Sequence, residues 1–119
     1  MSKIIVYGIP NCDITKKTLS WFKKNDITVT FHDYKMLGVT KEKLSAWIEK
    51  AGLDTILNKR STTWRALPVA EQEKITTPAA AIRLMMENNS IIKRPVIETA
   101  DKLLAGYNEP ALVKQFLDQ

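Results

Sequence analysis

A strand, a helix and a second strand follow one another within the first 34 residues, and this order constrains the fold more than any other feature. Residues 3–7 carry an apolar run that predicts a buried strand, and Gly8 and Pro10 interrupt it. Residues 13–25 have the spacing of a helix, and residues 28–34 alternate apolar and polar side chains as a strand does. A strand–helix–strand unit of this kind predicts two parallel strands joined by a right-handed crossover.

The remainder of the chain predicts further helices and one hairpin. Helices are expected over residues 41–51 and 78–87 and from about residue 109, with a less regular stretch over 54–68 and short strands at 96–99 and 102–105. The order βαβ, helices, ββα predicts an α/β fold with one mixed four-stranded sheet. The apolar stripes of the helices predict these core side chains: Leu19, Phe22, Leu44, Trp47, Ile48, Ala51, Ile82, Met85, Met86, Leu112, Val113, Phe116 and Leu117.

Composition indicates a single soluble domain over residues 1–119. Apolar residues make up 45% of the 119 residues and charged residues 26%, which is ordinary for a globular protein. No stretch approaches the roughly 20 apolar residues that span a bilayer, and the N-terminus does not have the pattern of a signal peptide. A single cysteine excludes an internal disulfide and favours a reducing compartment, so we expect a cytoplasmic protein.

The net charge of +5 favours small anionic ligands. Glutathione and inorganic oxyanions are the candidates. No clusters of basic and aromatic residues indicate binding of nucleic acid. The single histidine, His32, has no accompanying metal-ligand pattern, so no metal or tightly bound cofactor is expected.

Cys12 is the candidate catalytic residue because it lies where the first loop meets the first turn of a helix. Unpaired backbone N–H groups and the helix dipole favour an anion there, and thus a thiolate. The alternative is a small buried side chain without chemistry. The negative charge of Asp13 opposes a thiolate, and the positive charge of Lys16 offsets it. Asn11, Thr15 and Lys16 lie close to Cys12 in the sequence and are secondary candidates for the site.

A single thiolate can attack another sulfur or an electrophilic oxyanion, but it cannot release the product through an internal disulfide. Thr15 occupies the position of the second cysteine of a C-x-x-C motif. An external thiol must then resolve the intermediate, and glutathione is the abundant candidate, as a co-substrate. Acyl transfer would need a histidine base, and His32 on a strand makes that the weaker alternative, with packing its expected role.

Arg60 and Arg94 are the candidate residues for holding an anionic substrate. Each lies in a polar loop, and an arginine can bind an oxyanion or carboxylate in a bidentate way. The alternative for either side chain is a surface salt bridge. Lys59 and Arg65 are weaker candidates.

The sequence resembles the ArsC/Spx family of thioredoxin-like proteins, and within it the ArsC-related, YffB-like subgroup. Four blocks carry the resemblance over nearly the whole chain. They are Tyr7-Gly8-Ile9 with Cys12-Asp13 and Lys16-Lys17, Phe31-His32-Asp33-Tyr34-Lys35, Asn58-Lys59-Arg60-Ser61-Thr62-Thr63-Trp64-Arg65, and Lys93-Arg94-Pro95-Val96-Ile97.

The resemblance implies a thioredoxin-like core with an inserted helical subdomain at about residues 41–87, and Cys12 as the reactive thiol. Arg60 and Arg94 match two of the three arginines that hold the oxyanion in the family's arsenate reductases. Tyr107 stands in place of the third, which counts against arsenate as the substrate. Pro95 matches the cis-proline of the fold. The implied activity is that of a glutathione-dependent thiol reductase, with glutathione and glutaredoxin as partners.

The Spx branch of the family gives the alternative function. Its members are transcription regulators that bind RNA polymerase and do not catalyse a reaction. Many of them carry a C-x-x-C switch, and Thr15 leaves this chain without one.

Overall fold

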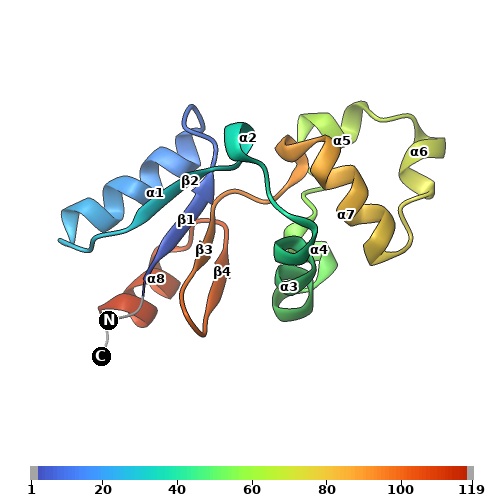
Figure 1. Cartoon of the computed structure of the whole chain (residues 1–119). Helices are drawn as coiled ribbons and strands as arrows, with labels where there is room; N and C mark the ends of the chain where they lie inside the picture. The colour runs from blue at the N-terminus through green and yellow to red at the C-terminus, as the bar shows by residue number, and fades with distance from the viewer. Residues whose placement is uncertain (1–2, 118–119) are drawn as a thin grey trace.

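The computed structural model describes residues 3–117, with a mixed four-stranded sheet at one end of the molecule and a group of helices at the other (Figure 1). Strand β1 (Ile5–Gly8) pairs parallel with β2 (Thr30–Asp33) and antiparallel with β3 (Val96–Glu98), which pairs antiparallel with β4 (Leu103–Ala105). Helix α1 (Asp13–Lys24) joins β1 to β2. The strand order is β2-β1-β3-β4. The sequence-based prediction of a βαβ unit and a C-terminal hairpin in one mixed sheet is therefore confirmed.

One face of the sheet packs against α1 and the C-terminal helix α8 (Glu109–Phe116). Val6 and Ile97 are paired on neighbouring strands, and both contribute to the core beneath these two helices. Trp21 and Phe22 of α1 and Leu112 of α8 complete this cluster of buried side chains. Since side chains alternate along a strand, Tyr7 and Val96 next to them belong to the second core, on the opposite face.

The second core joins the sheet to the helices between β2 and β3. These are α2 (Tyr34–Leu37), α3 (Lys41–Ala51), α4 (Leu53–Ile56), α5 (Thr62–Ala66), α6 (Val69–Glu73), α7 (Pro78–Glu87) and the 3-10 helix η1 (Asn89–Ile91). Leu44 and Trp47 of α3 and Met85 of α7 are fully buried in it. These helices lie beyond one face of the sheet (Figure 1), and the stretch at about residues 41–87, where the insertion is expected, contains α3 to α7.

Two polar residues start helices as the sequence predicts. Thr40 accepts a hydrogen bond from the N–H of Lys43 at 3.1 Å, and Thr77 accepts one from Ala80 at 3.2 Å. Pro78 follows in the first turn of α7, where a proline lacks only an N–H that the helix does not use. Each cap satisfies a donor that the first turn otherwise leaves unpaired.

Several expected boundaries are wrong. The strand expected over residues 28–34 is shortened to β2, because Asp33 Oδ1 accepts hydrogen bonds from Lys35 N (3.0 Å) and Met36 N (3.3 Å) and so starts α2. Gly8 is the last residue of β1 and does not interrupt it. The stretch expected to be irregular, 54–68, contains most of α4 and all of α5.

Three expected core side chains are exposed. Met86 is 47% exposed, Val113 37% and Leu117 45%. Helix α7 buries Ala81, Ile82 and Met85, so its apolar stripe is narrower than the sequence indicated. Only one residue of α8, Leu112, is fully buried, because this helix lies at the edge of the structure and covers a single face of the sheet.

Candidate active site

Cys12 lies between the end of β1 and the start of α1, at the N-cap position of the helix. Its backbone N–H donates to the carbonyl of Ile9 at 3.2 Å, and its own carbonyl accepts from the N–H of Lys16 at 2.9 Å. The side chain is partly exposed and packs against the edge of the second core. The sulfur therefore faces the unpaired N–H groups of the first helical turn and is not sealed in the apolar interior.

The pKa of the Cys12 thiol is lowered from its ordinary value. Partial burial acts in the opposite direction and raises it. The backbone N–H and the hydroxyl of Thr15, the N–H of Ile14 and the positive charge of Arg94 lower it, and together they outweigh burial. These groups all favour the charged form of the sulfur, so the site stabilises a thiolate.

Thr15 is fully buried one turn into α1, and its hydroxyl is the unusual polar group of the site. Among the described residues its Oγ1 makes no hydrogen bond of ordinary geometry, although the hydroxyl acts on the pKa of Cys12. The Thr15 hydroxyl thus lies close enough to Cys12 to favour the charged form of the thiol and lower its pKa. A buried hydroxyl without a partner costs about 1–3 kcal/mol.

Gly8, on the adjacent strand, leaves room for the Thr15 side chain. A Cβ atom at Gly8 would stand 2.6 Å from Thr15 Oγ1 and 2.8 Å from its Cγ2. The glycine is therefore required by the close approach of β1 to α1. It lets the buried hydroxyl lie against the strand beside the thiol.

Arg94 and Pro95 approach the site from the start of β3. The charge of Arg94 acts on Cys12 and also on Tyr34, a buried residue whose hydroxyl donates to the carbonyl of Ile92 at 2.9 Å. Burial raises the pKa of Tyr34; Arg94 lowers it and Cys12 raises it. The peptide bond between Arg94 and Pro95 is cis, as the resemblance implies.

Tyr34 is the site residue that sequence reasoning missed. It lies in one of the blocks that carry the family resemblance, but no chemical pattern in the sequence marked it out. Its position in the site depends on the tertiary hydrogen bond from its hydroxyl to the carbonyl of Ile92, 58 positions along the chain.

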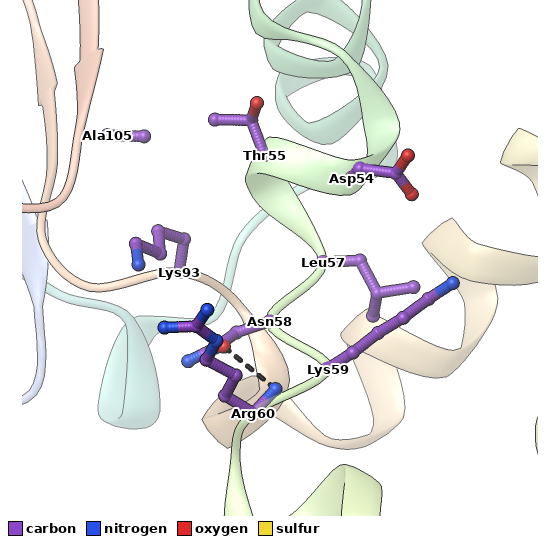
Figure 2. Close-up of a pocket in the computed structure, with 8 residues that line it drawn as sticks. All are labelled: Asp54, Thr55, Leu57, Asn58, Lys59, Arg60, Lys93 and Ala105. Carbon is purple, nitrogen blue, oxygen red and sulfur yellow. Dashed lines mark hydrogen bonds between the residues drawn. The ribbon is translucent and has the colours of Figure 1, made fainter.

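Arg60 is not among the groups that shift the pKa of Cys12. Within residues 3–117 no hydrogen bond joins its side chain to Cys12, and it lines a cleft with Lys93 and Asn58 (Figure 2). The structure therefore places the two candidate arginines differently, with Arg94 acting on the thiol and Arg60 in the cleft.

The remaining candidates lie at the surface or in packing positions. Asn11 and Lys16 are exposed on the thiol loop and the first turn of α1, and Arg65 is exposed on α5. Lys59 lies over the ring of Trp64, with Nζ 5.6 Å from its centroid.

Tyr107 and His32 both pack against neighbouring side chains. Tyr107, where the third arginine would be, lies beneath Lys17 Nζ at 4.9 Å. His32 packs on Tyr7 with ring centroids 4.8 Å apart, and its Nε2–H donates to the carbonyl of Gly38 at 2.9 Å, which agrees with the expected packing role.

Within residues 3–117, no three His, Cys, Asp or Glu side chains are grouped in a way that could hold a metal ion. Over the same residues, no helix has the length and apolar character needed to cross a membrane.

Comparison with known proteins now identifies the family. The ArsC family model matches residues 7–115. This chain belongs to the ArsC family. An uncharacterized protein of Haemophilus influenzae is 40% identical over 106 residues, which are 89% of this chain and 92% of that protein.

Two solved structures share the fold at 35% identity or above. The YFFB protein is 37% identical with a TM-score of 0.89, covering 94% of this chain and 97% of that one. An arsenate reductase (ArsC) related protein from Brucella melitensis is 35% identical with a TM-score of 0.76, covering 97% and 95%. The thioredoxin-like fold and the similarity to the YffB-like subgroup are therefore confirmed.

Regulators are also among the relatives of this ArsC-family chain. The regulatory protein MgsR of Bacillus subtilis is 28% identical over 114 residues, covering 94% of this chain and 89% of MgsR. A global transcriptional regulator Spx of Streptococcus agalactiae is 25% identical over 108 residues, covering 89% and 77%.

Proposed function

We propose that this protein is a glutathione-dependent thiol reductase that uses Cys12 as its single nucleophile. The observation that supports it most is the environment of the sulfur. Thr15, the first-turn N–H groups and Arg94 all favour a thiolate at a partly exposed position. A thiolate is the form of cysteine that attacks disulfides. Membership of a family with arsenate reductase-related members supports the same class of chemistry.

The reaction consists of three thiol–disulfide exchanges. In the first, the Cys12 thiolate attacks one sulfur of a disulfide substrate, forms a mixed disulfide and expels the other sulfur as a thiolate, which takes a proton from water. In the second, a glutathione thiolate attacks the sulfur of Cys12, expels the remaining half of the substrate as a thiolate and leaves glutathione on Cys12. In the third, a second glutathione thiolate attacks the glutathione sulfur of this adduct and expels the Cys12 thiolate. This step completes the reduction, so each substrate disulfide accepts two electrons as two glutathione molecules become glutathione disulfide.

An external thiol is needed because Thr15 stands where a second cysteine would be. A second cysteine at that position would displace the adduct, and the Thr15 hydroxyl cannot do so. Glutathione, with glutaredoxin as a further partner, fills this role in the cytoplasm. Arg94 stabilises the negative charge that develops at the reacting sulfurs.

Mass spectrometry after treatment with glutathione disulfide tests the proposal. We expect one glutathione on Cys12 at neutral pH, and none on the Cys12→Ser variant. Reduced glutathione should then remove the adduct. Absence of an adduct on the wild-type chain at neutral pH would refute the reductase proposal.

An oxyanion of the arsenate type is a second candidate electrophile, favoured by the similarity to the arsenate reductase (ArsC) related protein from Brucella melitensis. Tyr107 in place of the third arginine opposes it. Release of arsenite from arsenate and glutathione measures this activity directly, and we expect it to be weaker than disulfide reduction.

The identity with MgsR and Spx favours a regulator as the second candidate function. A regulator of the Spx type would bind RNA polymerase and would not require a reactive thiol. Retention of polymerase subunits by the purified chain, with equal retention by Cys12→Ser, would support the regulator over the enzyme.

A further inference from the structure

Two grooves lie beside the loop that carries Cys12, where α2 approaches the connection between β1 and α1 (Figure 1). Their volumes are about 380 Å³ and 250 Å³. Ile9 and Lys35 line both grooves, while Met36 lies in the first and Met86 in the second. The carbonyl of Ile9 accepts a hydrogen bond from the N–H of Cys12 at 3.2 Å, so a single turn of backbone joins the grooves to the reactive cysteine.

Apolar side chains are exposed on the walls of these grooves and next to them. Met36 is 81% exposed and Met86 is 47% exposed, and Leu37, which follows Met36 on α2, is 66% exposed. Pro10 is exposed in the first groove. Exposed apolar side chains that gather in one place mark an interaction site. Methionine suits such a site because its side chain is flexible and polarisable.

The turn that presents Met36 is held firmly by the fold. The carboxylate of Asp33 caps α2. The hydroxyl of Tyr34 donates to the carbonyl of Ile92 at 2.9 Å, and the carbonyl of Tyr34 accepts from Asn89 Nδ2 at 2.6 Å. Met36 is therefore held in position before a ligand arrives, and such preorganisation lowers the entropy that binding costs.

The charges on the walls cancel within each groove. Lys35 is the cation of both grooves, Asp33 is the anion of the first, and Glu87 is the anion of the second. Walls without net charge do not favour an acidic ligand such as glutathione, which carries two carboxylates. The exposed apolar side chains favour a neutral ligand with apolar side chains of its own, because contact between the two removes apolar surface from water.

The position of the grooves determines which part of a substrate lies over them. A substrate sulfur must contact the sulfur of Cys12, so the groups attached to it cover the surface beside the thiol. In an extended protein segment, a side chain two positions from a cysteine points the same way as the cysteine and stands roughly 6–7 Å along the chain. An apolar side chain at that spacing is placed to enter a groove while its cysteine meets Cys12.

We propose that the two grooves dock an extended apolar segment of a substrate protein, and so select protein disulfides with apolar flanking residues over glutathione disulfide. The inference rests on the proposed function and leaves its first exchange unchanged. The bond between Cys12 and a substrate sulfur forms as the substrate's own disulfide bond breaks, and the other sulfur leaves as a thiolate.

The test compares two peptides of equal length and charge, each with one cysteine joined to 2-thiopyridine by a disulfide. One peptide has leucine two positions before and after the cysteine, and the other has serine there. Release of thiopyridone measures the rate at which Cys12 attacks. We expect the wild-type chain to react about fourfold faster with the leucine peptide, which is the effect of burying one methylene group.

Met36→Gln and Met86→Gln keep the length of each side chain and make it polar. Each should lower the ratio of the two rates by about half, and the double variant should bring it close to one. Val69→Gln is the matched control, because Val69 is an exposed apolar residue of α6 that lines neither groove. This variant should keep the wild-type ratio.

The outcomes separate the inference from the proposed function beneath it. Equal rates with the two peptides, or an unchanged ratio in both methionine variants, would overturn the docking grooves, while reaction with both peptides would leave the reductase proposal intact. Absence of any reaction on the wild-type chain would overturn both. A wild-type chain that sediments as a dimer, with Met36→Gln as a monomer, would show that a second copy covers the grooves and would also overturn the inference.

Discussion

Replacing Glu98 by alanine tests how the helices between β2 and β3 are held on the sheet. Glu98 lies on β3, and its carboxylate accepts hydrogen bonds from Tyr7 OH at 3.0 Å, Trp47 Nε1 at 3.0 Å and Lys43 Nζ at 3.1 Å. Trp47 and Lys43 belong to α3, whereas Tyr7 belongs to β1. One carboxylate therefore links the sheet to the first long helix of the insertion.

The expected cost comes from the donors that the change leaves unpaired. Trp47 is fully buried and Tyr7 is 5% exposed, so water can hardly replace the lost acceptor. At about 1–3 kcal/mol for each buried unpaired donor, the two together give roughly 2–6 kcal/mol. The Lys43 side chain is 38% exposed, so the loss of its ion pair adds little.

Urea unfolding followed by circular dichroism measures this cost. Glu71→Ala is the control, because Glu71 and Lys74 form an exposed pair at 3.3 Å whose loss should cost less than about 0.5 kcal/mol. A free energy of unfolding for Glu98→Ala within 0.5 kcal/mol of that control would refute the reasoning, since the buried donors would then cost nothing.

The same carboxylate predicts a pH dependence of stability. Burial raises the pKa of Glu98, but hydrogen bonds from Trp47, Lys43 and Tyr7 and the charge of Lys43 outweigh it, and the net direction is down. A lowered pKa in the folded protein means that the contribution is fully present above the unfolded pKa of about 4.3 and is lost as pH falls through the folded value. The difference in stability between wild type and Glu98→Gln should shrink over that window; a constant difference would contradict it.

The remaining predictions concern the thiol and its neighbours. Thr15→Val removes the buried hydroxyl, so it should raise the pKa of Cys12 and slow adduct formation near neutral pH, whereas Thr15→Ser should stay near wild type. Equal alkylation profiles for all three chains would show that the Thr15 hydroxyl does not stabilise the thiolate. Gly8→Ala places a Cβ 2.6 Å from Thr15 Oγ1, so it should lower the free energy of unfolding by about 1–3 kcal/mol. An unchanged urea midpoint would show that β1 and α1 can move apart without cost. Arg94→Ala should raise the pKa of Cys12 and slow its reaction with glutathione disulfide while the circular dichroism spectrum stays the same; an unaltered rate would remove Arg94 from the site.

Local patterns predicted the sheet well because they depend on neighbours in the sequence. The βαβ unit, the hairpin and the caps at Thr40 and Thr77 are read from periodicity and from single residues at helix starts. Helix α2 was missed because Asp33 continues the alternation of a strand and at the same time caps the next helix. Burial of Thr15 could have been foreseen, since Thr15, Thr18 and Phe22 follow a helical stripe.

The positions of Arg60 and Met86 could not be foreseen from the sequence because they depend on tertiary contacts. Arg60 and Arg94 have the same residue type and similar loop contexts, but the Leu57–Ile92 bridge brings the loop of Arg60 beside Lys93. Met86 continues the stripe of Ile82 and Met85, but no element covers it. Such differences depend on which segments meet across the fold.

The rate of alkylation of Cys12 as a function of pH tests the central claim most directly. Iodoacetamide is added to the native chain across a pH series, and Cys12→Ser gives the background. The account predicts a midpoint below about 8.5, the value of an unperturbed cysteine, because the first-turn N–H groups, Thr15 and Arg94 stabilise the thiolate. A midpoint at or above that value would contradict it.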